Sequence, residues 1–434
     1  MFYFILSMTA IVAMLLAEIP VAFAFGLGAL LFALLTESNI SFLMAHGFLT
    51  SSGFALLALP LFIMAGTLMG RGGITERLLN FINAFVGRTK GGLGAVTVLA
   101  CALFGAISGS ATSAIAAIGQ IMVPRMVREG YPEGHATALV ACSSVLAIMI
   151  PPSIPMIVFA IAGGISVGAA FLSTLVPGIM LTIIYCLLNF VFLRNNQTIK
   201  VAPKQPFKAT MKEVSTTGSQ AVFSLLMPLI ILGGIYSGIF TPTEAAAVAV
   251  VYSAVIALYV YRGMTLSGLY DAIVSSAVIA GSIMAVLFFL FIMSRTMVLE
   301  QIPNQLADIL ISISDNKWVV LLMINLLLLL IGMIVDDVSG GILAAVIFMP
   351  VIRELGVDPV HFAAIVGTNL GLGNISPPCA PLLYMAGAIN KLSLDRYLKP
   401  TLKFLLLGHL PMVFIVTYFP QVSLFLPELV LGKL

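Results

Sequence analysis

A stretch that occurs twice constrains this chain more than any other feature. The first copy runs from Val123 to Phe159 and the second from Met349 to Met385. The copies share residues at one offset of 226, the difference between 350 and 124: Pro124 with Pro350, Gly130 with Gly356, His135 with His361, Pro151-Pro152 with Pro377-Pro378, and Pro155 with Pro381. An offset that stays constant over this length predicts that the two halves of the chain share one architecture.

A polar interruption lies just upstream of each copy, inside a run that is otherwise apolar. It is Ser108–Ser113 in the first half and Asp336–Gly340 in the second. Each half therefore contains a hairpin with a polar tip, followed by a helix that a Pro-Pro pair breaks. Interrupted apolar segments at corresponding positions of two halves are typical of the substrate site of a membrane transporter.

Composition places the chain in a membrane. Hydrophobic residues make up 61% of it and charged residues only 9%, whereas a soluble domain has about 25% charged residues. This balance leaves no room for a separate soluble domain, and we expect no nucleic-acid partner. The four cysteines all lie inside apolar runs, which favours buried packing over a disulfide framework or a zinc site.

The apolar runs predict an all-α polytopic membrane protein built as two repeats. Each hairpin arm is too short for a full span, so we expect a re-entrant hairpin whose tip is buried in protein. Each repeat then has about five spans and one hairpin. The predicted boundaries are 1–217 for repeat 1, with a hairpin at about 91–123 and a broken helix at 135–162, and 218–434 for repeat 2, with a hairpin at about 319–349 and a broken helix at 360–388.

The charges that flank the two hairpins predict their orientation. Six basic residues and three acids flank the first: Arg71, Arg77, Arg88, Lys90, Arg125, Arg128, Glu76, Glu129 and Glu133. Three basic residues and five acids flank the second: Arg295, Lys317, Arg353, Glu300, Asp308, Asp315, Glu354 and Asp358. By the positive-inside rule, the first hairpin enters from the cytoplasm and the second from the outside. An odd number of spans in each repeat independently requires the repeats to be inverted.

Several polar stretches have a structural interpretation. Residues 71–90 are predicted to form a polar connector that leads to the first hairpin. Thr241, Pro242 and Glu244 have the pattern of a capping box at a helix start. Asp336 and Asp337 are adjacent acids in an apolar stretch. They indicate either a gating or coupling function or a cap on the outgoing arm of the hairpin.

Backbone physics connects this architecture to chemistry. A helix broken inside the membrane exposes carbonyls at one end of the break and N–H groups at the other. Each such group costs several kcal/mol in lipid unless it faces a cavity or a ligand. Oxygen-rich tips suit a hard cation, and exposed N–H groups suit a carboxylate. The pattern predicts two pseudo-symmetric cation sites with an organic anion between them.

Four segments carry a resemblance to a known family: Leu56–Gly66, Ile107–Ser110, Ile150–Pro155 and Gly238–Ala247. Together they resemble the large membrane subunit, the DctM-like subunit, of tripartite ATP-independent periplasmic (TRAP) transporters. The resemblance covers nearly the whole chain. It implies a multi-pass protein of the bacterial inner membrane that works as an elevator-type secondary transporter driven by a sodium gradient. It also implies a carboxylate substrate and two partners, a small four-helix membrane subunit and a soluble periplasmic binding protein.

The resemblance also implies site residues by motif. The first sodium site would use Gly105, Ser108, Ala147, Ile150 and Pro152, and the second would use Gly332, Gly373, Ser376 and Cys379. Substrate contacts are expected from residues at the tips and breaks, namely Ser110, Thr112, Asn369 and Asn374. Most of the sodium ligands would be backbone carbonyls, so the path of the chain matters more than side-chain identity.

Three functional hypotheses follow. The first is the large subunit of a tripartite carboxylate transporter, which needs both partners for uptake. The second is a stand-alone sodium–carboxylate symporter of similar inverted-repeat build, which transports alone. The third is an intramembrane hydrolase with Ser108 as nucleophile and His135 as base; it is disfavoured because His135 lies beside Glu133 at a predicted helix start, away from the hairpin tip.

Overall fold

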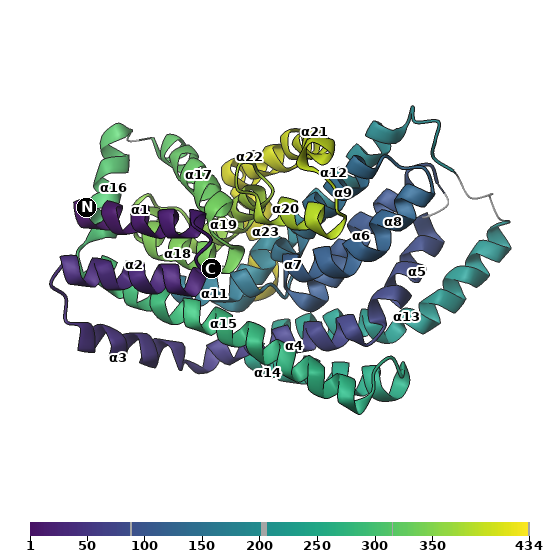
Figure 1. Cartoon of the computed structure of the whole chain (residues 1–434), viewed down its shortest axis with the longest axis horizontal. Coiled ribbons are helices and arrows are strands. Elements are labelled where there is room, and N and C mark those ends of the chain that lie inside the picture. Colours follow the sequence, from purple (N-terminus) through teal and green to yellow (C-terminus); the bar gives the residue numbers. More distant parts are fainter. Residues whose placement is uncertain (87–88, 201–205, 315, 433–434) are drawn as a thin grey trace.

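A computed structural model describes residues 1–86, 89–200, 206–314 and 316–432 of the chain (Figure 1). In these ranges every regular element is a helix, and no strand occurs. Seven helices are long and apolar enough to cross a membrane, or eight if the bent pair Glu133–Met149 and Ile154–Gly163 is counted as one span. The prediction of an all-α polytopic protein is confirmed.

The first half of the chain forms α1 (Phe2–Leu16), α2 (Val21–Leu35), α3 (Ile40–Ser51), η1 (Phe54–Leu57), α4 (Ala58–Arg71), α5 (Ile74–Val86), α6 (Gly92–Ser108), α7 (Ala111–Ala114), η2 (Ile115–Gly119), α8 (Gln120–Arg128), α9 (Glu133–Ser144), α10 (Leu146–Met149), α11 (Ile154–Gly163) and α12 (Val167–Leu193). The second half forms α13 (Phe207–Tyr236), α14 (Pro242–Val255), η3 (Ile256–Val260), α15 (Leu266–Leu299), α16 (Ile302–Ile313), α17 (Lys317–Ile334), α18 (Asp337–Glu354), α19 (Pro359–Asn374), α20 (Pro381–Ile389), α21 (Leu394–Phe404), η4 (Leu405–His409), α22 (Leu410–Tyr418) and α23 (Pro420–Leu431).

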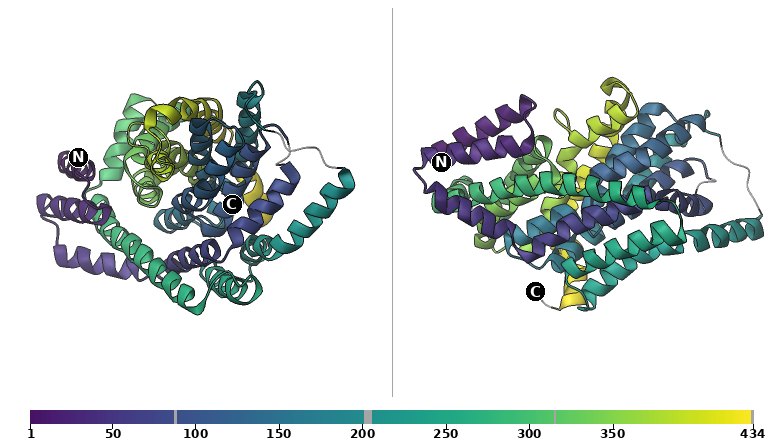
Figure 2. Two further views of the ribbon diagram at one scale, coloured as in Figure 1. Left: turned by 45° about the vertical axis from the view of Figure 1, so that its right-hand side comes forward. Right: turned by 60° about the horizontal axis from the view of Figure 1, so that its bottom comes forward.

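The helices form two layers. Helices α2, α3, α4, α13, α14 and α15 contact one another and make an outer layer, called the scaffold layer below. The helices from α6 to α12 and from α17 to α23 form a bundle on the other side, called the core bundle (Figure 2). Helix α15 belongs to the scaffold layer but also contacts α18 of the core bundle, so the two layers meet along it.

Each half builds one hairpin and one broken helix. The first unit consists of the hairpin at residues 92–128 and the broken helix at 133–163; the second consists of the hairpin at 317–354 and the broken helix at 359–389. In both units, the Pro-Pro pair lies between the two parts of the broken helix, and its peptide bond is cis. The two parts of the first broken helix are bent by 41°. The two units therefore have the same order of elements.

Local sequence explains where each hairpin turns. In the first, α6 ends at Gly109 with φ 63°, a left-handed conformation that favours glycine, and Ser110 then caps α7. In the second, the carboxylate of Asp336 accepts hydrogen bonds from the backbone N–H groups of Val338 and Ser339, at 3.0 and 3.1 Å. The capping interpretation of Asp336 is therefore confirmed. Thr241 and Glu244 form the predicted capping box at the start of α14.

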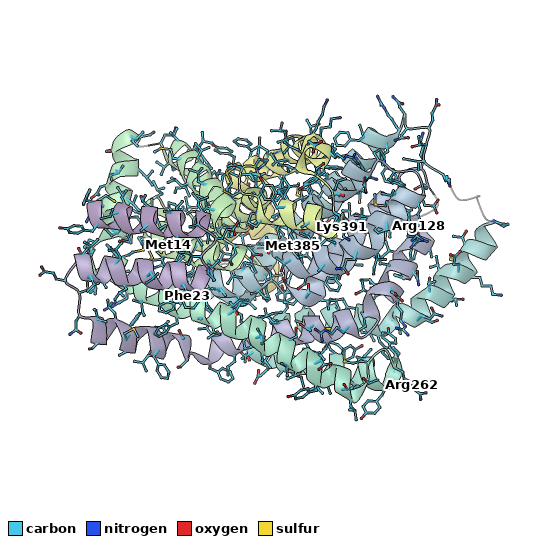
Figure 3. The ribbon with its side chains drawn as sticks, viewed as in Figure 1. Met14, Phe23, Arg128, Arg262, Met385 and Lys391 are labelled. Carbon is cyan, nitrogen blue, oxygen red and sulfur yellow. The ribbon has the colours of Figure 1, made fainter. Side chains whose placement is uncertain are left out.

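The two units pack across each other. The outgoing arm of the second hairpin, α18, packs on α11 of the first broken helix, where Gly341 approaches the carbonyl oxygen of Pro155. The outgoing arm of the first hairpin packs on α20 of the second broken helix. Arg128 and Lys391, labelled in Figure 3, line one hollow of about 430 Å³ where α8 and α20 end. Each hairpin therefore supports the broken helix of the opposite half.

Several predicted boundaries differ from the structure. Residues 74–86 form α5, an amphipathic helix, so the expected polar connector at 71–90 is wrong over most of its length. The first hairpin continues to Arg128, and the second turns at Val335 and Asp336, with Gly340 already inside α18. Helix α23 was not expected. The predicted division at 217 and 218 falls inside α13.

Two residues of the charge argument, Arg88 and Asp315, lie outside the described residues. The inverted orientation of the halves in the bilayer stays a prediction, because it rests on charge and on the number of spans.

Candidate transport site

The first unit is held together by close backbone contacts. A Cβ atom on Gly105 of α6 would lie 2.5 Å from the Cα of Ala147, so only glycine permits this approach. At the tip, the N–H of Ile154 donates to the carbonyl oxygen of Gly109 at 3.1 Å. A Cβ on Gly109 would lie 2.8 Å from the carbonyl oxygen of Pro152. The hairpin tip therefore lies directly against the Pro-Pro break.

The second unit has an equivalent contact. A Cβ on Gly373 of α19 would lie 2.5 Å from the carbonyl carbon of Gly332 on α17. After the break begins, the hydroxyl of Ser376 donates to the carbonyl oxygen of Leu372 at 2.7 Å. Two predicted sodium ligands, Gly332 and Gly373, are thus in contact, as the pair Gly105 and Ala147 is in the first unit.

The atoms around the breaks fit a hard cation better than a transition metal. Among the described residues, no group of three or more His, Cys, Asp or Glu side chains could hold a metal ion. Ser108 is 2% exposed, and the hydroxyl of Ser153, beside Pro152, is fully buried without a hydrogen-bond partner in the described part of the chain. Carbonyl and hydroxyl oxygens are the ligands that hard cations prefer. Cys379 carries a free, partly exposed thiol, a soft group that does not match this chemistry.

A cavity of about 220 Å³ lies where the two hairpin tips meet. Its polar lining comes from the hydroxyls of one tip and the carboxylates of the other. The scaffold layer and α11 contribute the apolar wall. The residues are Ile63, Gly66, Thr67, Ser108, Gly109, Ser110, Thr112, Ser113, Ile154, Pro155, Ile279, Ile283, Asp336, Asp337 and Val338. We call this space the tip cavity.

A second, wider cavity of about 620 Å³ adjoins the tip cavity. It is lined by the start of α2, by part of α15 and by the second tip, and it shares Ile283, Asp336 and Val338 with the tip cavity. Phe23 of α2, labelled in Figure 3, is part of its wall. The hydroxyl of Ser339, which also lines it, is buried without a partner among the described residues.

The predicted substrate residues separate into two groups. Ser110 and Thr112 line the tip cavity, and their hydroxyl oxygens lie 2.9 Å apart. Asn369 and Asn374 do not line it. The side-chain amide of Asn374 donates to the carbonyl oxygen of Leu370 at 3.0 Å, inside its own helix. The amide of Asn369 is 1% exposed and takes part in a buried network between helices. A role in substrate binding stays a prediction for all four residues.

The structure does not assemble a serine hydrolase. The hydroxyl of Ser108 contacts the backbone of Ser110, at 3.4 Å to its N–H and 3.5 Å to its carbonyl oxygen. The Nε2 atom of His135 lies 3.1 Å from the side-chain oxygen of Asn189 on α12. No hydrogen bond joins Ser108 to His135, so the base is not positioned to activate the nucleophile.

Sequence reasoning missed three parts of this site. Ser153 carried no signal except its place after the Pro-Pro pair. Ile279 and Ile283 of α15 close the tip cavity, but two isoleucines in a long apolar helix do not identify themselves as site residues. Gly66 of α4 had a clearer signal, because it lies in one of the resembling segments. A Cβ on Gly66 would lie 2.9 Å from the Cα of Ser108, so α4 packs directly on the first tip.

Comparison with known proteins decides the family. Residues 8–422 match the family model described as the DctM component of the tripartite ATP-independent periplasmic transporter. The chain belongs to this family. It is 38% identical to the C4-dicarboxylate TRAP transporter large permease protein DctM of Pseudomonas aeruginosa, over 92% of each chain. It is 36% identical to the sialic acid TRAP transporter large permease protein SiaM of Vibrio cholerae, over 96% of this chain and 97% of the relative.

A solved structure supports the fold alone. The crystal structure of the YdaH transporter of Alcanivorax borkumensis superimposes with a TM-score of 0.64 at 15% sequence identity, over 88% of each chain. The family and the apolar helices make this chain a multi-pass protein of the bacterial inner membrane and a transporter permease subunit, not an enzyme.

Proposed function

We propose that this chain is the large permease subunit of a sodium-driven secondary transporter that imports an organic acid. A soluble periplasmic binding protein delivers the substrate, and a small four-helix membrane subunit completes the complex. The tip cavity carries the proposal, because there hydroxyls and carboxylates from both halves face one space beside two broken helices. The relatives named for C4-dicarboxylates and sialic acid support the carboxylate class.

Sodium coupling rests on the oxygen-rich breaks. The expected ligands lie around the two breaks. Around the first they are Gly105, Ser108, Ala147, Ile150 and Pro152, and around the second they are Gly332, Gly373, Ser376 and Cys379. Carbonyl and hydroxyl oxygens at these positions would replace the hydration shell of a sodium ion. The carboxyl groups of Asp336 and Asp337 supply further oxygen atoms to the cavity, and a bound cation would reduce the repulsion between an ionised carboxylate there and an anionic substrate.

An elevator mechanism fits the two layers. The scaffold layer contains the longest helices, α13 and α15, whereas both hairpins and both broken helices belong to the core bundle. In the proposed cycle the core bundle moves as a body against the scaffold layer and carries the tip cavity across the membrane. The contacts of Ile279 and Ile283 with the cavity would then change in each cycle, while those of Ser108 and Ser110 would persist.

Uptake by proteoliposomes tests the proposal. The chain is reconstituted with its small membrane partner, and the binding protein is added after loading with a labelled carboxylate. We expect uptake only when both an inward sodium gradient and the loaded binding protein are present. Uptake without the binding protein would instead establish the stand-alone sodium–carboxylate symporter. Equal uptake in sodium and choline media would contradict sodium coupling.

A further inference from the structure

A buried polar network joins three helices behind the second break. The side-chain amide of Asn369 on α19 donates to the side-chain oxygen of Asn325 on α17 at 2.9 Å. The amide of Asn325 donates to the hydroxyl of Thr417 on α22, also at 2.9 Å. The second hydrogen of the Asn369 amide goes to the carbonyl oxygen of Ile365 at 2.8 Å. We call Asn325, Asn369 and Thr417 the amide network.

The amide network lies on the faces where α17 meets α19. Asn325 precedes Gly332 by two helical turns on α17, and Asn369 precedes Gly373 by about one turn on α19. Residues at these spacings share one side of a helix. Helices α17 and α19 are therefore held together at two points, by the hydrogen bond between the asparagines and by the close contact between the glycines.

The described residues at the equivalent positions of the first unit form no such network. The repeat offset places Ser143 of α9 opposite Asn369, and the buried hydroxyl of Ser143 has no hydrogen-bond partner among the described residues. The same offset places Leu99 opposite Asn325. Asn325 and Asn369 are 5% and 1% exposed, so neither is available to solvent. Two polar side chains are thus buried in one half at positions where the other half has a leucine and a serine.

We infer that the amide network positions the second cation site. This role rests on the proposed function, because the residues of the amide network would hold Gly332 and Gly373 in place without contacting the ion. Hydrogen bonds hold α17 at one height against α19, and this register sets where the carbonyls around the second break point. A shift of α17 along α19 would move the carbonyls of α17 relative to those at the second break and weaken cation binding.

A structural role and a positioning role of the amide network have different effects on uptake. Loss of a structural hydrogen bond lowers the stability of the fold and the amount of active protein. Loss of a positioning contact raises the sodium concentration that gives half-maximal uptake, while the maximal rate at saturating sodium is retained. The half-saturating concentration for the loaded binding protein also stays unchanged.

Substitutions within the network test the inference. Asn325→Leu removes two hydrogen bonds with little change of volume, and Thr417→Val removes one. Interhelical hydrogen bonds in membranes are individually modest, so we expect the half-saturating sodium concentration to rise about tenfold for Asn325→Leu and about threefold for Thr417→Val. Thr417→Ser restores the hydroxyl and should restore the wild-type value. Ser143→Ala, at the equivalent place in the first unit, is the matched control and should change nothing.

Sodium-dependent thermal stabilisation provides a second readout that needs no transport. A ligand that binds only the folded state raises its stability with concentration, so purified variants can be titrated with sodium chloride against choline chloride. We expect the stabilisation curve of Asn325→Leu to shift to higher sodium by the same factor as uptake. If wild-type protein shows no sodium dependence in either assay, the proposed function fails. If wild-type depends on sodium and Asn325→Leu has the wild-type half-saturation, the inference alone is wrong.

Discussion

The two hairpin units have the same architecture, but different contacts hold each hairpin against its broken helix. In the first, the tip bonds to the break through backbone, from Ile154 to Gly109, and α6 lies on α10 through Gly105. In the second, the glycine contact recurs at Gly332 and Gly373, and the amide network adds side-chain hydrogen bonds. The repeat thus preserves the path of the backbone, while each half stabilises that path with different side-chain contacts.

The shared glycine contacts should give the largest effects. Gly105→Val and Gly373→Val each place a branched side chain where even a Cβ would lie 2.5 Å from the backbone. We expect both variants to lose nearly all uptake and about 3 kcal/mol of stability, at the upper end of the usual range, because overpacked sites force the backbone to move. Thermal unfolding in detergent and uptake measure the two effects. Gly233→Val is the control, since nothing lies within 4 Å of a Cβ there.

If Gly105→Val keeps normal uptake while Gly373→Val is inactive, the two contacts are not equivalent. The claim that the two units share one architecture at the glycine contacts would then be wrong.

The acids of the second tip should give an intermediate effect. Asp337→Asn replaces a carboxyl group that lines the tip cavity with a neutral amide, and we expect uptake to fall about tenfold through weaker cation binding. Asp336→Asn should keep more activity, because asparagine caps a helix about as well as aspartate. Initial uptake rates across a range of sodium concentrations measure both. A larger loss for Asp336→Asn than for Asp337→Asn would show that the carboxylate of Asp336, and not that of Asp337, is the one the cavity needs.

The acid that caps α14 in the scaffold layer should give the smallest effect. Glu244 accepts hydrogen bonds from the N–H and the hydroxyl of Thr241, both at 2.8 Å. Glu244→Ala breaks this capping box and should lower the unfolding temperature slightly, with normal uptake at saturating sodium. Glu244→Gln, which can still complete a capping box, should restore the stability. Loss of uptake in Glu244→Gln would place a transport function in the scaffold layer instead.

The sequence predicted backbone features well, because prolines and glycines act locally. The Pro-Pro breaks, the Gly109 turn and the Asp336 cap each follow from one or two residues. Helix α5 was missed because the charges of Arg71, at the end of α4, and of Glu76 and Arg77, in the first turn of α5, suggested a connector. The rest of α5 has a buried apolar face.

Contacts between distant segments were beyond sequence reasoning. Asn325 and Asn369 are 44 residues apart, and nothing in either segment indicates that their amides meet. Asn369 was expected to contact substrate because it lies near a break, but its burial against α17 became visible only in the folded chain. The sequence pattern locates a helix break. Which helix faces meet at the break depends on how the whole bundle packs.

The most direct test of the account is the sodium dependence of uptake by the reconstituted wild-type complex, measured with loaded binding protein over a range of sodium concentrations at constant ionic strength. Two cation sites that both support one tip cavity predict a sigmoidal dependence and no uptake in choline. A dependence that is hyperbolic would leave only one of the two units binding the coupling ion. Uptake that does not change when choline replaces sodium would contradict the central claim.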